Sequence, residues 1–315
     1  MVVRESIARD VLRLIIWYPV RWFLTIIPLR AAYPSLRALG SLHYAISGRK
    51  NARLFENFEL GLGQKGFTRA GVQEAVRDYY RNHYVNQLQI FIFPRLNRRN
   101  VGKVHEFEGL ERLDASLKEN KGCILLHSHF GPSQMPLHIL GVLGYQVVQL
   151  GLPTDEGLSF IGRRVAFRLR LKYESKIKAR IIPATSFLRP LFETLKNNGV
   201  LLMTGDGAGK GKLIGKLSVE RFLGNDVFFT TGSRILAEKT GAVVLPMFTV
   251  LENGRYRTVI HEPLNKNGTE TVISDFVKIM ESYVVRYPHL WHFWDEFDGR
   301  IASPEKEAQT PGYAN

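Results

Sequence analysis

The feature that most constrains this chain is the alternation of short apolar runs with helical stretches that begins near residue 104. Short apolar runs predict buried strands, and repeated strand–helix alternation is typical of a largely parallel sheet covered by helices. The predicted strands are 104–107, 122–129, 146–150, 180–183 and 200–204, and the predicted helices between them are 111–119, 133–143, 158–175 and 187–197. We therefore expect an α/β fold with a mixed, largely parallel central sheet flanked by helices.

A hairpin and further helices complete the expected architecture. The segment Glu252-Asn-Gly-Arg255 separates apolar runs at 242–251 and 256–261, and Asn-Gly in this position predicts a hairpin. Thr68 is a suitable N-cap for a long helix that ends near residue 93. Further helices are predicted at 231–240 and 271–286, and the polar, proline-containing tail from residue 301 is expected to be disordered.

The N-terminal apolar run, 11–29, predicts a membrane-associated helix. It reads VLRLIIWYPVRWFLTIIPL, and its length nearly matches the thickness of a bilayer. Arg13 and Arg21 interrupt it, and a charge at mid-bilayer costs about 3 kcal/mol. Its Trp and Tyr residues prefer the membrane interface. An interfacial or obliquely inserted helix is therefore favoured over a true span, with a helix packed on the domain as the remaining alternative.

These patterns divide the chain into four expected regions. Residues 1–40 would form the membrane-associated helix, 41–100 a helical lead-in, 101–300 the α/β domain, and 301–315 the disordered tail.

The net charge of +14 indicates an acidic partner. Nucleic acid, an anionic membrane surface and an acidic protein are the three common kinds. The basic residues are spread along the chain without a nucleic-acid recognition motif, so nucleic acid is not expected. The single cysteine, Cys123, rules out an intramolecular disulfide, suits a reducing compartment and is expected to be a buried core residue.

The most informative stretch is 125–134, LLHSHFGPSQ, in which an apolar strand leads into two histidines and a glycine turn. Sites in open α/β sheets form beyond the carboxyl ends of strands, where His129 is expected. A histidine there can take a proton from a hydroxyl nucleophile. Gly131 allows a tight turn and the close approach of a substrate, with His127 beside it, and the next helix would direct its N-terminal amides to the same place. The alternative is a purely structural histidine.

A second candidate segment is the glycine-rich turn 205–212, GDGAGKGK. It lacks the phosphate-loop spacing, so nucleotide binding is not expected. Asp206 is either a turn residue or a functional carboxylate, and Lys210 is a candidate contact for lipid phosphates. His289 and His292 lack metal-ligand spacing, and we interpret them with Trp291 and Trp294 as packing and interfacial anchoring; no metal site is expected.

The order of several motifs resembles the late acyltransferases of lipid A biosynthesis, which include lauroyl and myristoyl transferases and related glycolipid acyltransferases. His129-Phe-Gly131 matches the start of the family's His-Phe-Gly-Asn-Trp-Glu motif. The segments that resemble the family's later motifs, in order, are 204–209, 221–224, 231–246 and 287–294. The resemblance covers nearly the whole chain.

This resemblance implies a glycerolipid-acyltransferase-like fold and O-acyl transfer. The donor would be an acyl carrier protein or acyl coenzyme A, and the acceptor a hydroxyl of a lipid A precursor or another glycolipid. His129 would act as the general base without an acyl-enzyme, a metal or another cofactor, on the cytoplasmic face of a bacterial inner membrane. It also implies an oxyanion-stabilising arginine after the third strand, for which Arg164 is the first choice. Arg170 follows as a substrate contact. The alternative for both arginines is that they belong to a solvated basic face of a helix.

One departure from the family pattern concerns the acid that should follow the histidine, because Gln134 occupies that position. The family's carboxylate is thought to orient the histidine, and loss of the corresponding charge in a serine protease costs about 10⁴ in rate. Gln134 could still accept a hydrogen bond, or Asp155, Glu156 or Asp206 could substitute in space. The rival hypothesis is a catalytically inactive relative that binds lipid or assists a membrane partner.

Overall fold

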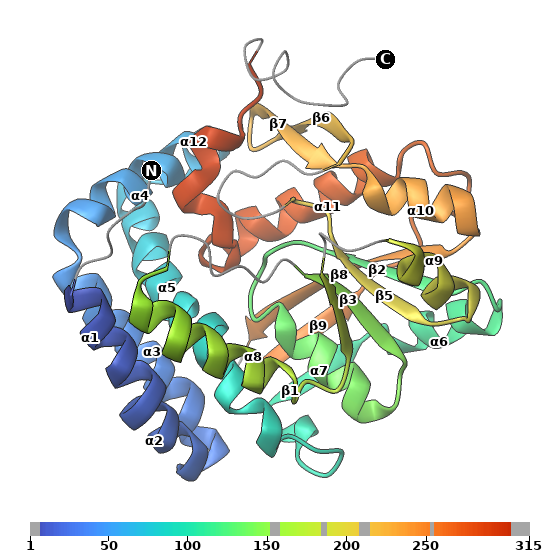
Figure 1. Cartoon of the computed structure of the whole chain (residues 1–315). Helices are drawn as coiled ribbons and strands as arrows, with labels where there is room; N and C mark the ends of the chain where they lie inside the picture. The colour runs from blue at the N-terminus through green and yellow to red at the C-terminus, as the bar shows by residue number, and fades with distance from the viewer. Residues whose placement is uncertain (1–6, 152–157, 184–187, 208–214, 253–254, 304–315) are drawn as a thin grey trace.

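The computed structural model describes residues 7–151, 158–183, 188–207, 215–252 and 255–303 (Figure 1). Its centre is a seven-stranded sheet with the strand order β1-β9-β8-β2-β5-β3-β4. Every neighbouring pair is parallel except β8 and β9, which are antiparallel. The strands are β1 His105–Glu108, β2 Cys123–His127, β3 Val147–Gly151, β4 Arg180–Pro183, β5 Val200–Thr204, β8 Val243–Glu252 and β9 Arg255–Ile260. The predicted mixed, largely parallel α/β sheet is confirmed.

Alternate residues of the strands enter two hydrophobic cores, one on each face of the sheet. Ile124 and Leu126 of β2 pack into one core, and Cys123 and Leu125 into the other. The first core is covered by α9 Arg189–Lys196, α10 Gly232–Thr240 and α11 Val272–Arg286; the second by α6 Leu110–Lys118, α7 Gln134–Leu143 and α8 Arg168–Glu174. The N-terminal helices contribute residues to both cores. Strand β2 is buried on both faces, which explains why it is apolar from Cys123 to Leu126.

The structure contains a two-stranded antiparallel ribbon that was not predicted from the sequence. It consists of β6 Leu217–Phe222 and β7 Asn225–Thr230. Its turn places Leu223 at φ 50° and Gly224 at φ 76°, the left-handed pair that a tight hairpin needs. The turn residues are Leu223 and Gly224 instead of the Asn-Gly pair that is typical of such hairpins. The hairpin could therefore not be recognised from its turn residues.

The N-terminal helices form a layer at one side of the sheet (Figure 1). They are α1 Ile7–Ile15, α2 Arg21–Ile26, α3 Leu29–Ile46, α4 Gly48–Leu62 and α5 Arg69–Leu88. A π-helical segment, Ile16–Val20, joins α1 to α2 and contains Pro19. Because proline lacks an amide hydrogen and crowds the preceding turn, it displaces the regular hydrogen-bond pattern there. Within the described residues, no helix combines the length and apolar character needed to cross a bilayer.

The predicted long helix exists with the predicted cap, since the Thr68 hydroxyl accepts a hydrogen bond from the Gly71 amide at 3.2 Å. It ends earlier than expected, at Leu88, and continues as short 3₁₀ turns around Pro94. The predicted helix 158–175 is confirmed as helical from residue 160, with a π-helical segment, Gly162–Phe167, that leads into α8. Of the tail, the residues from 304 onward lie outside the described part of the chain.

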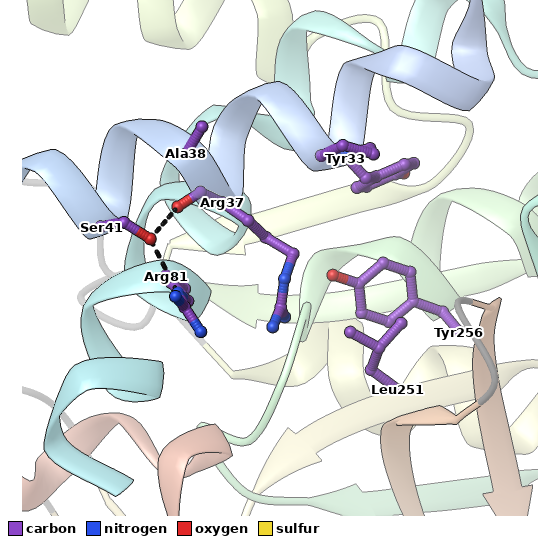
Figure 2. A pocket seen from close by; sticks show the side chains of 8 residues that line it. Tyr33, Arg37, Ala38, Ser41, Arg81, Leu251 and Tyr256 are labelled. Atoms are coloured by element: carbon purple, nitrogen blue, oxygen red, sulfur yellow. Dashed lines mark hydrogen bonds between the residues drawn. The ribbon is translucent and has the colours of Figure 1, made fainter. Parts of the chain in front are cut away.

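A cavity of about 610 Å³ lies where α3 and α5 meet the ends of β8 and β9 (Figure 2). Its lining residues are Tyr33, Pro34, Arg37, Ala38, Ser41, Arg81, Leu251 and Tyr256.

Candidate active site

The loop after β2 positions His129 at the carboxyl end of the sheet. Strand β2 ends at His127, and α7 begins at Gln134. Gly131 has φ 58°, and a Cβ atom there would lie 2.4 Å from the carbonyl oxygen of Thr249 in the neighbouring strand. Only glycine tolerates both the left-handed backbone and this close approach. Gly131 therefore shapes the turn that presents His129.

The C-terminal segment fixes this loop from the other side. The Gly131 amide donates to the Leu290 carbonyl at 2.8 Å, and the His292 amide donates to the His129 carbonyl at 2.8 Å. The Ser133 amide donates to the Gly131 carbonyl at 2.9 Å. The first two of these hydrogen bonds join the loop to the segment after α11.

Asp206 is the carboxylate that contacts His129. It lies two residues beyond β5, the sheet neighbour of β2, and the Gly205 amide extends the pairing by donating to the His127 carbonyl at 2.7 Å. One carboxylate oxygen lies 2.9 Å from His129 Nδ1, and the other accepts from the His129 amide, also at 2.9 Å. This two-point contact fixes both the backbone and the imidazole ring.

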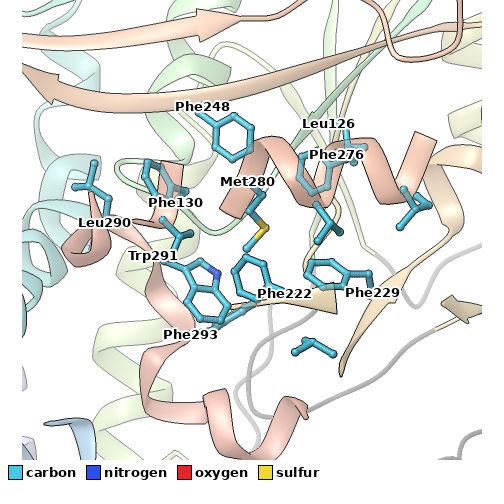
Figure 3. Close-up of a cluster of buried hydrophobic side chains, with 14 of the residues drawn as sticks. Leu126, Phe130, Phe222, Phe229, Phe248, Phe276, Met280, Leu290, Trp291 and Phe293 are labelled. Atoms are coloured by element: carbon cyan, nitrogen blue, oxygen red, sulfur yellow. The ribbon is translucent and has the colours of Figure 1, made fainter. Parts of the chain in front are cut away.

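Two residues near the C-terminus complete the surroundings of Asp206. Trp291 Nε1 donates to an Asp206 carboxylate oxygen at 3.1 Å, and the Arg300 guanidinium donates to the Asp206 carbonyl at 2.7 Å. Trp291 belongs to the buried aromatic cluster beside the loop, with Phe130, Phe222 and Phe293 (Figure 3). Trp291 and Trp294 are 1% and 0% exposed, so the expectation of packing is confirmed and that of interfacial anchoring is wrong.

The electrostatics favour an ionised Asp206. Burial alone raises the pKa of this carboxyl, but the charge and hydrogen bonds of His129, together with the charge of Arg300, outweigh it and lower the pKa below its usual value. An ionised carboxylate only accepts hydrogen bonds, so Nδ1 of His129 carries the proton. Nε2 is then the unprotonated nitrogen, and the His129 side chain is 30% exposed. The arrangement can take up a proton at Nε2.

The other histidines nearby have different environments. His127 is 3% exposed, and its Nδ1 donates to the Ser128 carbonyl at 3.0 Å. Burial, with the charge of His129, lowers the pKa of His127 to about 4. Burial likewise lowers the pKa of His292 to about 3, and its ring centre lies 6.5 Å from that of His129. Both rings are therefore neutral near pH 7.

In the described part of the chain, no hydrogen bond or ion pair joins His129 or Asp206 to three further predicted site residues, Gln134, Arg164 and Arg170. Gln134 is the half-buried first residue of α7 and, among the described residues, makes no hydrogen bond to His129. Arg164 is exposed and lies over the Phe160 ring at 5.8 Å, and Arg170 pairs with Glu174 at 2.7 Å. Lys210, Asp155 and Glu156 lie outside the described residues. The roles of Gln134, Arg164 and Arg170 stay predictions.

The sequence predicted Asp206 as a candidate catalytic carboxylate and as one of three residues that could replace the missing acid, but Arg300 and the hydrogen bond of Trp291 were missed. A signal for Asp206 existed, because it directly follows the strand predicted at 200–204. Arg300 carries no such signal, since it lies 94 residues further along the chain.

In the described part of the chain, no group of three or more His, Cys, Asp or Glu side chains could hold a metal ion.

A buried aspartate that orients a partly exposed histidine is an arrangement that can support general-base catalysis. Fold and site thus define an α/β protein with such a pair beyond the carboxyl ends of a largely parallel sheet. The comparison with protein families narrows this class: residues 5–295 match the bacterial lipid A biosynthesis acyltransferase family, and the chain belongs to that family. The resemblance noted from the motifs is confirmed, and membership supports acyltransferase activity in general. A search of curated proteins found no significant match.

Proposed function

We propose that this protein transfers a fatty acyl group from a thioester, carried by acyl carrier protein or coenzyme A, to a hydroxyl of a lipid A precursor or a related glycolipid. His129 Nε2 takes the proton of the acceptor hydroxyl as its oxygen attacks the thioester carbonyl carbon. The carbon–sulfur bond breaks, and the proton passes to the departing thiolate. The products are an ester and a free thiol, without an acyl-enzyme, a metal or another cofactor.

The hydrogen-bonded pair of His129 and Asp206 carries this proposal. Asp206 is 2% exposed and holds Nδ1 at 2.9 Å, which leaves Nε2 as the available base. The nearby negative charge also stabilises the imidazolium that forms during transfer. An inactive relative was favoured only by the neutral Gln134, and the Asp206 carboxylate supplies the charge that Gln134 lacks.

Exposed apolar residues support a proposed location on the cytoplasmic face of a bacterial inner membrane. The N-terminal helices expose a set of large hydrophobic side chains: Ile7, Val11, Leu12, Ile15, Tyr18, Trp22, Phe23 and Ile26. An exposed apolar set of this kind, on a chain with a net charge of +14, suits the interfacial position on anionic lipid that we propose. Arg164 is proposed to stabilise the oxyanion, Arg170 to contact the substrate, and Lys210 to contact lipid phosphates or the acidic carrier protein.

The decisive experiment measures acyl transfer by the purified full-length protein, with variants of both members of the pair. His129→Ala should abolish transfer. Asp206→Asn keeps the shape but removes the charge, so kcat should fall by about 10³–10⁴. His138→Gln is the matched control, because it alters a buried histidine whose ring stacks on Phe93 and whose Nδ1 accepts from the Lys178 amide, and it should retain transfer.

Two outcomes would contradict the proposal. Full activity in His129→Ala would exclude this base, and His127 would then be the next residue to test. A wild-type protein that binds the donor and acceptor without any transfer would support the inactive relative. Mass spectrometry of lipids from cells lacking the gene would identify the acceptor by its missing acyl group.

A further inference from the structure

The cavity between α3 and α5 contains two arginines. Figure 2 shows the guanidinium groups of Arg37, from α3, and Arg81, from α5, extending into the same space beside Tyr256. Ser41 links the two helices: its hydroxyl accepts from Arg81 Nε at 2.7 Å and lies 3.2 Å from the Arg37 carbonyl, to which it donates. Ser41 thus binds the Arg81 side chain to α3, and both arginines line the same cavity.

The charge balance of this cavity is positive. Arg81 forms an ion pair with Asp78 at 2.7 Å, whereas no carboxylate in the described part of the chain pairs with Arg37. Glu252, next to the lining residue Leu251, is engaged by Arg257 and by the Tyr287 hydroxyl. Burial lowers the pKa of nearby His289 to about 4, so it adds no charge near pH 7. The uncompensated charge is that of Arg37.

Two tyrosines form the wall opposite these arginines. Tyr33 and Tyr256 are 9% and 2% exposed, and their ring centres lie 5.2 Å apart. The Tyr33 hydroxyl is buried without a hydrogen-bond partner, and Figure 2 shows the Tyr256 hydroxyl directed toward the arginine side. Guanidinium and phenol groups are hydrogen-bond donors, and arginine is the side chain that best recognises phosphate.

A second cavity, of about 510 Å³, lies on the adjacent face of α3. Ala38 lines both cavities. The small Ala38 side chain therefore lies at the border of both spaces. The other residues of the second cavity are almost all apolar: Ile15, Pro19, Val20, Phe23, Leu24, Ser35, Leu39 and Leu42.

We propose that these two cavities bind one anionic phospholipid of the bilayer, with its phosphate between Arg37 and Arg81 and an acyl chain in the apolar cavity. The charge of Arg37 and the apolar walls are complementary to the two ends of such a lipid. Phe23 and Leu42, which line the apolar cavity, are 48% and 62% exposed, so the cavity opens onto the exposed apolar surface. This proposal does not depend on acyl transfer.

The position of α5 favours a bilayer lipid over the acyl acceptor as the occupant. Arg81 faces α3, where its Cα would lie 2.4 Å from a Cβ atom on Gly40. Tyr79 and Asn86 instead contact His292, whose amide binds the His129 carbonyl. Helix α5 thus separates the cavity from the His129 site.

Calorimetric titration of the full-length protein with soluble short-chain lipids tests this proposal. The probes are dihexanoyl phosphatidylglycerol, neutral dihexanoylglycerol and inorganic phosphate. Arg37→Gln with Arg81→Gln should raise the Kd for phosphatidylglycerol about tenfold or more, the effect of losing charge-assisted hydrogen bonds. Ala38→Trp, which fills the junction, should weaken phosphatidylglycerol binding but leave phosphate binding unchanged.

Arg180→Gln is the matched control, because it removes the same charge from an exposed residue of β4, at the far edge of the sheet. It should leave all three affinities unchanged, and thermal melting would confirm that each variant is folded. Equal affinity for the neutral and anionic lipids, or no effect of the arginine changes, would overturn the proposal. A KM increase in the arginine variant for a phosphorylated acceptor, but not for its dephosphorylated form, would assign the cavity to the acceptor instead.

Discussion

At the scale of single residues, the carboxylate that serves His129 comes from a different strand than the family motif suggests. In the motif, the acid follows the histidine in the same loop; here Asp206 reaches it from the end of β5. The two strands are neighbours in the sheet, so the same imidazole nitrogen is accessible from either loop. A neutral residue at position 134 is therefore compatible with a charged pair.

Substitutions at Gln134 should consequently have little effect on acyl transfer. Asp206 already accepts the hydrogen bond from Nδ1–H of His129, which is the N–H of the neutral ring. A second carboxylate in Gln134→Glu would therefore find no further N–H on this ring to accept from. We expect kcat to change less than about threefold in Gln134→Glu and Gln134→Ala, well below the 10³–10⁴ expected for loss of the triad-type charge. A tenfold increase of kcat in Gln134→Glu, measured by the same transfer assay, would show that residue 134 orients His129.

Trp291 should act as a positioning residue for Asp206. Trp291→Phe keeps an aromatic ring in the buried cluster but removes the Nε1 donor at 3.1 Å from the carboxylate. Because a hydrogen bond to a charged group contributes about 1.5–3 kcal/mol, kcat should fall roughly tenfold or more, with KM nearly unchanged. The pH profile of kcat should also shift, since the environment of the pair changes; an unaltered profile and kcat would show that Trp291 only packs.

At the scale of elements, periodicity located nearly every strand and helix of the sheet domain, because buried strands and amphipathic helices are local patterns. The β6–β7 ribbon was missed since its turn depends on Leu223 at positive φ, which a tertiary setting imposes. The two π-helical segments were also missed. Pro19 disturbs the hydrogen-bond pattern in the segment Ile16–Val20, whereas no residue of the segment Gly162–Phe167 indicates a π-helix.

The exposed face of the N-terminal helices should determine membrane binding. Ile15, Trp22 and Ile26 are 47%, 71% and 73% exposed, whereas Leu24, on the same helix as the latter two, is 1% exposed. Replacing the three exposed residues with Gln, Ser and Gln therefore removes the apolar surface without opening the core. We expect the variant to move from the membrane fraction to the soluble fraction.

A matched control replaces exposed apolar residues elsewhere, Leu60 on α4 and Leu188 before α9, with glutamine. These changes should leave membrane partitioning unaltered. If the N-terminal variant also stays on the membrane, the interfacial role moves to the basic helix around Arg164 and Arg170.

At the scale of the whole molecule, the site brings together three distant parts of the chain. His129, Asp206 and the segment 291–300 meet through the order of strands in the sheet and through the C-terminal segment that follows α11. Local sequence patterns place each strand end but do not specify which loop faces which. His129 could therefore be predicted from its own neighbourhood, whereas the choice of Asp206 as its partner required the three-dimensional fold.

The buried histidines should make folding stability strongly dependent on pH. His105, His127 and His138 are 2%, 3% and 1% exposed, and Nε2 of each lacks a hydrogen-bond partner. Burial lowers the pKa of these residues to about 3, 4 and 4. In the unfolded chain they titrate near pH 6.5. Between about pH 6.5 and 4 the unfolded chain therefore binds more protons than the folded protein, so acidification favours unfolding.

Each such group lowers the unfolding free energy by up to about 1.4 kcal/mol per pH unit over this range, so these three contribute up to about 4 kcal/mol per pH unit. Burial also lowers the pKa of His83, His289 and His292, to about 4, 4 and 3, so these residues steepen the slope further. Urea denaturation at a series of pH values measures this slope. His138→Gln removes one titrating group but keeps an acceptor for the Lys178 amide, whose nitrogen lies 3.3 Å from His138 Nδ1. The dependence of the unfolding free energy on pH should therefore decrease by the contribution of about one proton. The lowered pKa of Asp206 acts only at lower pH, through its folded-state titration, and leaves this window unchanged. A stability that stays constant from pH 6.5 to 4.5 would show that these rings accept protons in the folded protein.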